Sequence, residues 1–293
     1  MKRVICAALA LALLLAGCAG PAPQEGDQGD TFGIVTSFYP VYIAALNIAN
    51  GVEGVTVTNL VNSQVGCLHD YTLTTEEMRK IEACDVLVIN GAGMEPFMDK
   101  ISANMPELPV ISASDGISLI EEDGETNPHV WMDVKNAIEQ VDAIAKRLGE
   151  LCPEHADTFA KNARAYQEKL TALDAEIRQS LAPVAGAKLV TFHQAFTYFA
   201  NAYHLEIAAV IRRDEHSAPS PAEVEAVIET MKAEKIHAIF IEPQYQDSVA
   251  ETVSAATGAM VYTLDPAVTG DASEDAYLDI MRENVRTLLE ALQ

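Results

Sequence analysis

Short apolar runs and longer amphipathic segments alternate along most of the chain from residue 31 onward. The short runs are rich in Val, Ile and Phe and almost continuously apolar, which is typical of strands buried on both faces of a parallel sheet. The sequence therefore predicts an α/β protein with two lobes, each a mainly parallel four-stranded sheet with helices. The predicted strands are 32–37, 55–61, 86–90 and 109–113 in one group, and 188–192, 207–211, 238–242 and 260–264 in the other.

Between the two groups, the segment from Pro153 to Leu181 contains no Gly and no interior Pro. Its apolar residues recur at steps of three and four, which predicts one amphipathic helix. At 1.5 Å per residue this helix would be roughly 40 Å long, so we interpret it as a rigid connection between the lobes, with a ligand cleft between them. Two shorter helices in an ordinary bundle are the alternative. The apolar positions are Phe159, Ala163, Tyr166, Leu170, Leu173, Ile177 and Leu181.

Three other helix starts carry capping signals. Thr74 with Glu77 matches a capping box, and so does Ser220 with Glu223. Asp133 is expected to cap the helix that follows it.

The first residues have the pattern of an export signal. Lys2 and Arg3 precede an apolar run that is too short for a convincing membrane span, and small residues lead into Cys18. The stretch "LAGC" resembles the bacterial lipobox, in which the cysteine is lipidated; an ordinary signal peptide with an incidental cysteine is the alternative. We expect a lipoprotein signal peptide at 1–17, a flexible tether at 18–30, an N-terminal lobe at 31–152, a linking helix at 153–182 and a C-terminal lobe at 183–293.

The formal net charge is −24, and the signal segment contributes two positive charges to it and no acid. Such acidity disfavours nucleic acid and anionic membrane surfaces as partners, because both would repel the chain. It is compatible with a cationic ligand.

Four residues with metal-binding side chains lie at or beyond the carboxyl ends of predicted strands: His69, His129, His193 and Asp265. In open α/β sheets ligands bind at these ends. Three imidazoles and one carboxylate suit zinc better than magnesium or calcium, which prefer all-oxygen shells. The spacing matches no local zinc motif, so the residues alone leave each histidine open to an ordinary structural role.

Several stretches, in this order around the long helix, resemble the metal-binding solute-binding proteins of zinc and manganese ABC transporters. They are "GCLHDYTLTTEEMRKIEACDVLVINGAGME", "NPHVWMD", "TFHQAFTYFANAYHLE", "IFIEPQ" and "LDP". The resemblance covers nearly all of residues 32–293. It implies two α/β lobes joined by a rigid helix, with a metal ion bound in the cleft by the residues named above. Manganese members usually carry an acid at the position of His193, so the resemblance favours zinc.

The chain departs from the family's pattern before the first histidine. Leu68 stands where a proline is usual, and Cys67 is not the common form. Cys67 is expected to be a small buried hydrophobe, with a role as ligand or redox-sensitive neighbour as the alternative. Residues 115–128 are expected to form a short acidic loop, a solvated charge run or a funnel for cations. Glu242 could orient a ligand histidine, and His216 is a candidate transient ligand.

We therefore expect a monomeric, non-enzymatic protein that captures Zn²⁺ and delivers it to an ABC transporter permease. It would be lipid-anchored through Cys18 to the outer face of the cell membrane, or periplasmic in an organism with two membranes. A manganese-binding protein of the same family is the first alternative. A zinc hydrolase with Glu242 as general base, or an adhesin lipoprotein with a structural metal, are the others.

Overall fold

The structure is a computed structural model that describes residues 31–61, 66–69, 71–122, 124–211, 219–244 and 248–293. The predicted signal peptide, the tether with Cys18, and His216 lie outside the described residues. Residues 32–293 form one compact unit.

The first lobe is built on a parallel four-stranded sheet in the order β2-β1-β3-β4. Its central strands are entirely or largely buried, as near-continuous Val, Ile and Leu require. The strands are β1 (Phe32–Thr36), β2 (Val55–Asn59), β3 (Val86–Ile89) and β4 (Val110–Ser112), and the helices connecting them are α2 (Tyr39–Ile48), α3 (Thr75–Glu82) and α4 (Met98–Asn104).

The second lobe repeats this plan with a parallel sheet in the order β10-β9-β7-β8. All eight predicted strands are confirmed, each to within two residues at its ends, and the predicted fold class is confirmed with them. The strands are β7 (Lys188–Thr191), β8 (Glu206–Val210), β9 (Ala238–Ile241) and β10 (Met260–Thr263), and the helices are α7 (Thr197–Ala202), α8 (Pro221–Glu234) and α9 (Ser248–Thr257).

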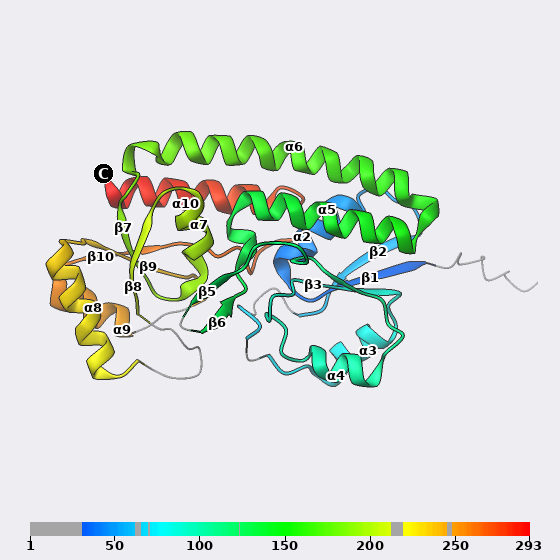
Figure 1. The fold of residues 1–293 in the computed structure, drawn as a ribbon, viewed down its shortest axis with the longest axis horizontal. Coiled ribbons are helices and arrows are strands. Elements are labelled where there is room, and N and C mark those ends of the chain that lie inside the picture. The colour runs from blue at the N-terminus through cyan, green and yellow to red at the C-terminus, as the bar shows by residue number, and fades with distance from the viewer. Residues whose placement is uncertain (1–30, 62–65, 70, 123, 212–218, 245–247) are drawn as a thin grey trace, which may run out of the picture. The chain divides into compact units, whose positions relative to one another are not determined.

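One uninterrupted helix, α6 (Ala156–Leu181), stands between the two lobes in the chain, so the two-helix alternative is wrong. Its seven predicted apolar positions are its buried residues. They face α5 (Val134–Leu151) and α10 (Ala276–Leu292), and Figure 1 shows α6 running along both, with α10 beneath one half of it and α5 beneath the other. Because α6 packs on a helix from each half of the chain, the lobes share one continuous apolar core.

The three predicted caps are present. Thr74 and Ser220 each accept a hydrogen bond from the backbone N–H three residues on, and Glu77 and Glu223 complete the two capping boxes. Asp133 accepts from the backbone N–H of Lys135 at the start of α5.

The predicted acidic loop at 115–128 is wrong in part, because it contains an antiparallel hairpin of β5 (Ile120–Glu122) and β6 (Glu125–Asn127). The strands are Ile-Glu-Glu and Glu-Thr-Asn, in which Glu and Asn, residues depleted in strands, outnumber Ile and Thr, and neither has an apolar alternation, so the sequence carries no clear strand signal there. Side-chain hydrogen bonds stabilise the hairpin instead, such as Thr126 Oγ1 to Glu121 Oε1 at 2.8 Å.

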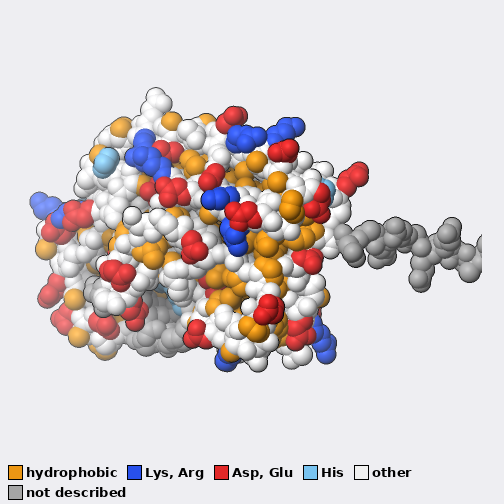
Figure 2. Space-filling model, turned by 45° about the vertical axis from the view of Figure 1, so that its right-hand side comes forward, with side chains coloured by type: hydrophobic (Ala, Val, Ile, Leu, Met, Phe, Trp, Pro, Cys, Tyr) orange, Lys and Arg blue, Asp and Glu red, His pale blue; other side chains and the backbone are white. Residues whose placement is uncertain are grey.

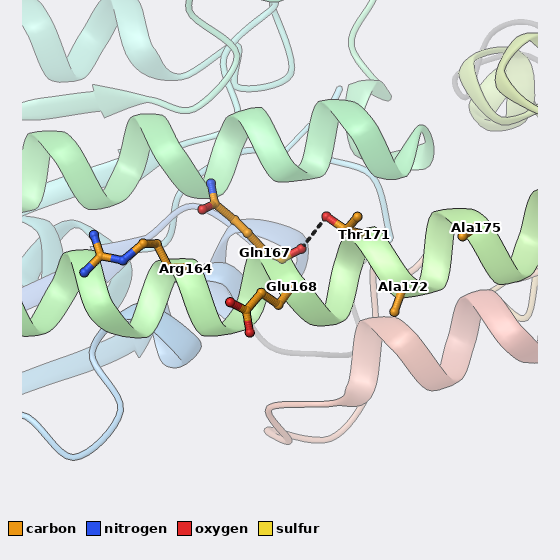
Figure 3. A pocket seen from close by; sticks show the side chains of 6 residues that line it. All are labelled: Arg164, Gln167, Glu168, Thr171, Ala172 and Ala175. Carbon is orange, nitrogen blue, oxygen red and sulfur yellow. Dashed lines mark hydrogen bonds between the residues drawn. The ribbon is translucent and has the colours of Figure 1, made fainter.

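A groove along α6 has neither His nor Cys among its lining residues. Within it, the hydroxyl of Thr171 donates to the backbone oxygen of Gln167 (Figure 3). Acidic side chains are spread over the visible face rather than gathered in one patch (Figure 2). Within the described residues, no helix combines the length and apolar character needed to span a membrane.

Candidate metal site

Three histidines from separate loops lie side by side. His69 follows β2, His129 follows β6 at the start of the 3₁₀ turn Val130–Met132, and His193 follows β7. The centroid of the His129 ring is 4.9 Å from that of His193 and 5.2 Å from that of His69, and the His69 and His193 centroids are 5.9 Å apart. Because His69 and His129 come from the first lobe and His193 from the second, the cluster joins both lobes.

A cysteine belongs to the same cluster. The Sγ atom of Cys67 lies 3.3 Å from Nε2 of His129. Cys67, His69 and His129 each place one donor atom within 4.8 Å of the other two. Cys67 is buried, as the sequence predicts, but its thiol faces an imidazole.

Asn127 orients His129. Its Oδ1 lies 2.8 Å from Nδ1 of His129, and the two N–H groups of its amide donate to Glu122 Oε2 and to the backbone oxygen of Gln194. With the amide fixed in this way, Nδ1 of His129 carries the proton and Nε2 presents its lone pair to Cys67. Burial, with smaller contributions from His193 and His69, lowers the pKa of His129 well below its usual value, so the ring is neutral.

Glu242 takes a similar position behind His193. Its Oε1 lies 3.3 Å from Nδ1 of His193, and both side chains are almost completely buried. A carboxylate beside Nδ1 favours the tautomer in which Nδ1 carries the proton and Nε2 has the lone pair, which is the arrangement that metal-ligating histidines usually have. The contact is close but is not a hydrogen bond, so the orienting role of Glu242 stays a prediction.

Asp265 follows β10 and is held by its own loop. Its Oδ1 accepts from the backbone N–H of Ala267 at 2.8 Å, and its backbone pairs with the side-chain amide of Asn284 in both directions. Burial raises the pKa of Asp265 to about 6, and the nearby Glu242 carboxylate adds to this effect. Asp265 is not a member of the close group formed by Cys67, His69 and His129.

Trp131 connects the loop of His129 to the loop of Asp265. Its indole N–H donates to the backbone oxygen of Pro266 at 2.7 Å, and its own backbone oxygen accepts from the hydroxyl of Tyr277 at 2.6 Å. The Trp131 ring centroid is 5.3 Å from that of His129. The sequence carries no signal for these contacts of Trp131 or for the role of Asn127, since contacts of this kind depend on tertiary structure.

Two α/β lobes on a common long helix, with imidazoles converging from the carboxyl ends of strands of both lobes, define a metal-binding solute-binding protein. The profile of the family described as "ZnuA: Zinc-uptake complex component A periplasmic" matches residues 34–291, and the chain belongs to this family. It is therefore an extracytoplasmic substrate-binding component of metal ABC transport and not an enzyme.

Relatives of the chain bind different metals. It is 28% identical to the manganese-binding lipoprotein MntA of Halalkalibacterium halodurans over 97% of this chain and 96% of that protein. It is 30% identical to the iron-binding protein YfeA of Yersinia pestis, over 86% and 82% of the two chains. The solved structure of the binding protein FpvC of Pseudomonas aeruginosa with Mn²⁺ superposes with a TM-score of 0.81 at 30% identity, covering 89% of this chain and 98% of that one.

Proposed function

We propose that the protein captures Zn²⁺ outside the cytoplasm and delivers it to the permease of an ABC transporter for import. The ligands in this proposal are the imidazoles of His69, His129 and His193 and the carboxylate of Asp265. The lipid anchor of the proposal is Cys18, and the binding unit is a monomer. These assignments rest on the resemblance of the sequence and on the geometry above.

The observation that carries the choice of zinc is the donor set. Three imidazoles lie together, Asn127 holds Nδ1 of His129 so that its Nε2 is available, and the Glu242 carboxylate lies 3.3 Å from Nδ1 of His193. Nitrogen donors suit zinc, whereas manganese favours carboxylate and other oxygen ligands. The relatives named for manganese and iron show that this fold accepts several metals. The metal preference therefore has to be inferred from the donor atoms of the site.

Delivery requires that the ion leave the cluster without a large hinge motion, because the lobes share one core with α6. Trp131 bonds to the loop that carries Asp265, and it lies two residues after His129. We propose that a local shift of these two loops together opens the ligand shell when the permease docks.

The test is a competitive metal titration of residues 19–293, with bound metal read by mass spectrometry. We expect one tightly bound Zn²⁺ per chain, at least about tenfold weaker binding in His193→Ala, and weaker binding of Mn²⁺ than of Zn²⁺. His237→Ala is the matched control, because His237 is exposed before β9 and is outside the cluster. Tight Mn²⁺ binding with weak Zn²⁺ binding would contradict the proposal.

Import is tested in cells. A strain that lacks the gene should grow poorly when zinc is chelated and recover with the wild-type gene. It should not recover with the gene for His193→Ala.

A further inference from the structure

Cys67 is the donor that the proposed ligand set leaves unused. It lies two residues before His69 on the loop after β2 and is 9% exposed. Its position contrasts with that of Cys84, whose thiol donates to the carbonyl of Ile81 in the preceding helical turn. Cys84 is a thiol satisfied by backbone, whereas Cys67 is directed at a ring nitrogen of the cluster.

The distances fit one ion shared by sulfur and nitrogen. Zinc binds sulfur at about 2.3 Å and imidazole nitrogen at about 2.0–2.1 Å, so two such donors on a tetrahedral ion are roughly 3.6 Å apart. The separation of Cys67 Sγ and His129 Nε2 is 3.3 Å. The ring nitrogen concerned is the one that Asn127 leaves available, and a donor atom of His69 is within 4.8 Å of both.

The charge of the bound state favours a thiolate as well. Two of the three imidazoles are almost completely buried, His129 at 1% and His193 at 4% exposed, while His69 is partly exposed, and a net charge on the buried side of the site is costly. Three neutral imidazoles and one carboxylate would leave Zn²⁺ with a net charge of about one. A thiolate from Cys67, added to the Asp265 carboxylate in a five-coordinate shell, would bring the complex to neutrality.

We propose that Cys67 binds the ion together with the histidines, as a thiolate ligand that gives the site its preference for soft and borderline metals over Mn²⁺. On binding, the Sγ–H bond breaks, the proton passes to solvent and the sulfur lone pair forms the bond to the metal. This inference rests on the proposed function, because it concerns the same ion. It makes this chain's site sulfur-containing, and it makes Cys67 a determinant of specificity.

X-ray absorption of the stoichiometric Zn²⁺ complex tests the bond directly. We expect a sulfur neighbour at about 2.3 Å from zinc in the wild type and in Cys84→Ser, and only nitrogen and oxygen neighbours in Cys67→Ser. The Co²⁺ complex should show sulfur-to-cobalt charge-transfer absorption with the same dependence on the variants. Circular dichroism establishes that each variant is folded, and Cys67→Ala provides a second variant without an oxygen donor.

Affinities measured on the same proteins test the specificity. Loss of a group that only orients a ligand lowers metal affinity by about 10–100-fold, so we expect Cys67→Ser and Cys67→Ala to lose at least tenfold in Zn²⁺ affinity. Their Mn²⁺ affinity should change by much less, so that the ratio of the two affinities falls.

The outcomes separate this inference from the proposed function. Tight Zn²⁺ binding that depends on His193, with no sulfur neighbour and no loss in Cys67→Ser, overturns the role of Cys67 and leaves the function standing. A sulfur neighbour with preferred binding of another soft metal supports the role of Cys67 and overturns the choice of zinc. Absence of stoichiometric binding of any divalent cation overturns both.

Discussion

The hydroxyl of Tyr277 should be worth a measurable part of the stability of the whole protein. It donates to the backbone oxygen of Trp131 at 2.6 Å, between α10 of the second lobe and the turn that follows His129. Tyr277 is 5% exposed, and burial is the main cause that raises its pKa well above 10, so the hydroxyl keeps its proton at any ordinary pH. Tyr277→Phe removes this donor without changing the shape of the ring.

The magnitude follows from the acceptor that is left behind. The backbone oxygen of Trp131 is buried, and a buried polar group that loses its partner costs about 1–3 kcal/mol. For a protein of this size 1 kcal/mol lowers Tm by about 2–4 °C, so we expect a fall of roughly 2–12 °C. No cavity forms, because the two side chains differ only by the hydroxyl group.

The assay is thermal and urea unfolding of metal-free protein, followed by far-UV circular dichroism and by the fluorescence of Trp131. Tyr262→Phe is the control, since its hydroxyl contacts the sulfur of Met260 at 3.8 Å near the surface of the edge strand β10. A Tm for Tyr277→Phe equal to that of Tyr262→Phe would refute the argument that this bond holds the two lobes together.

Three further predictions concern the first lobe. Trp131 is the single tryptophan of the chain and its ring centroid is 5.3 Å from that of His129, so its emission should change on Zn²⁺ binding and stay constant in His193→Ala at the same metal concentration. Gly91→Ala should lower the free energy of unfolding by at least about 1–3 kcal/mol in urea titrations, because φ is +81° and the new Cβ would lie 2.3 Å from Ser112 Oγ. Burial raises the pKa of Glu95 to about 7, so between pH 4.5 and 7 the folded state holds a proton on this carboxyl that the unfolded state has lost. The free energy of unfolding should therefore fall as pH rises through this range, by on the order of 3 kcal/mol in total. Glu95→Gln should lack this fall when its unfolding free energy is measured over the same pH range.

The strands and the long helix could be predicted because their signals are local. Parallel strands covered on both faces must be apolar throughout, and the buried stripe of α6 must repeat every three to four residues. The hairpin of β5 and β6 has neither signal. It forms because residues distant in the chain complete its polar groups, as when Tyr198 of α7 accepts from the N–H of Ile120 and donates to the oxygen of Asn127.

The candidate site divides in the same way. Histidines at the ends of predicted strands can be found from the sequence, since topology alone brings the carboxyl ends of parallel strands together. The role of Asn127 cannot be predicted from the sequence, because an Asn before Pro is an ordinary turn signal. Its role depends on where Glu122 and Gln194 lie in the folded protein. The direction of the Cys67 thiol is likewise a property of the folded loop.

The segment from Asn127 to Trp131 couples the ligand shell to the contact between lobes. Asn127 fixes the ring of His129, and Trp131 bonds to the loop of Asp265 and to Tyr277. A change that loosens this contact should therefore lower stability and metal affinity together, because the same turn serves both. A change confined to a donor atom, such as Cys67→Ser, should lower affinity while the metal-free protein keeps its stability. Comparing Tyr277→Phe with Cys67→Ser separates the part of the binding energy that comes from pre-organisation from the part that comes from the donors.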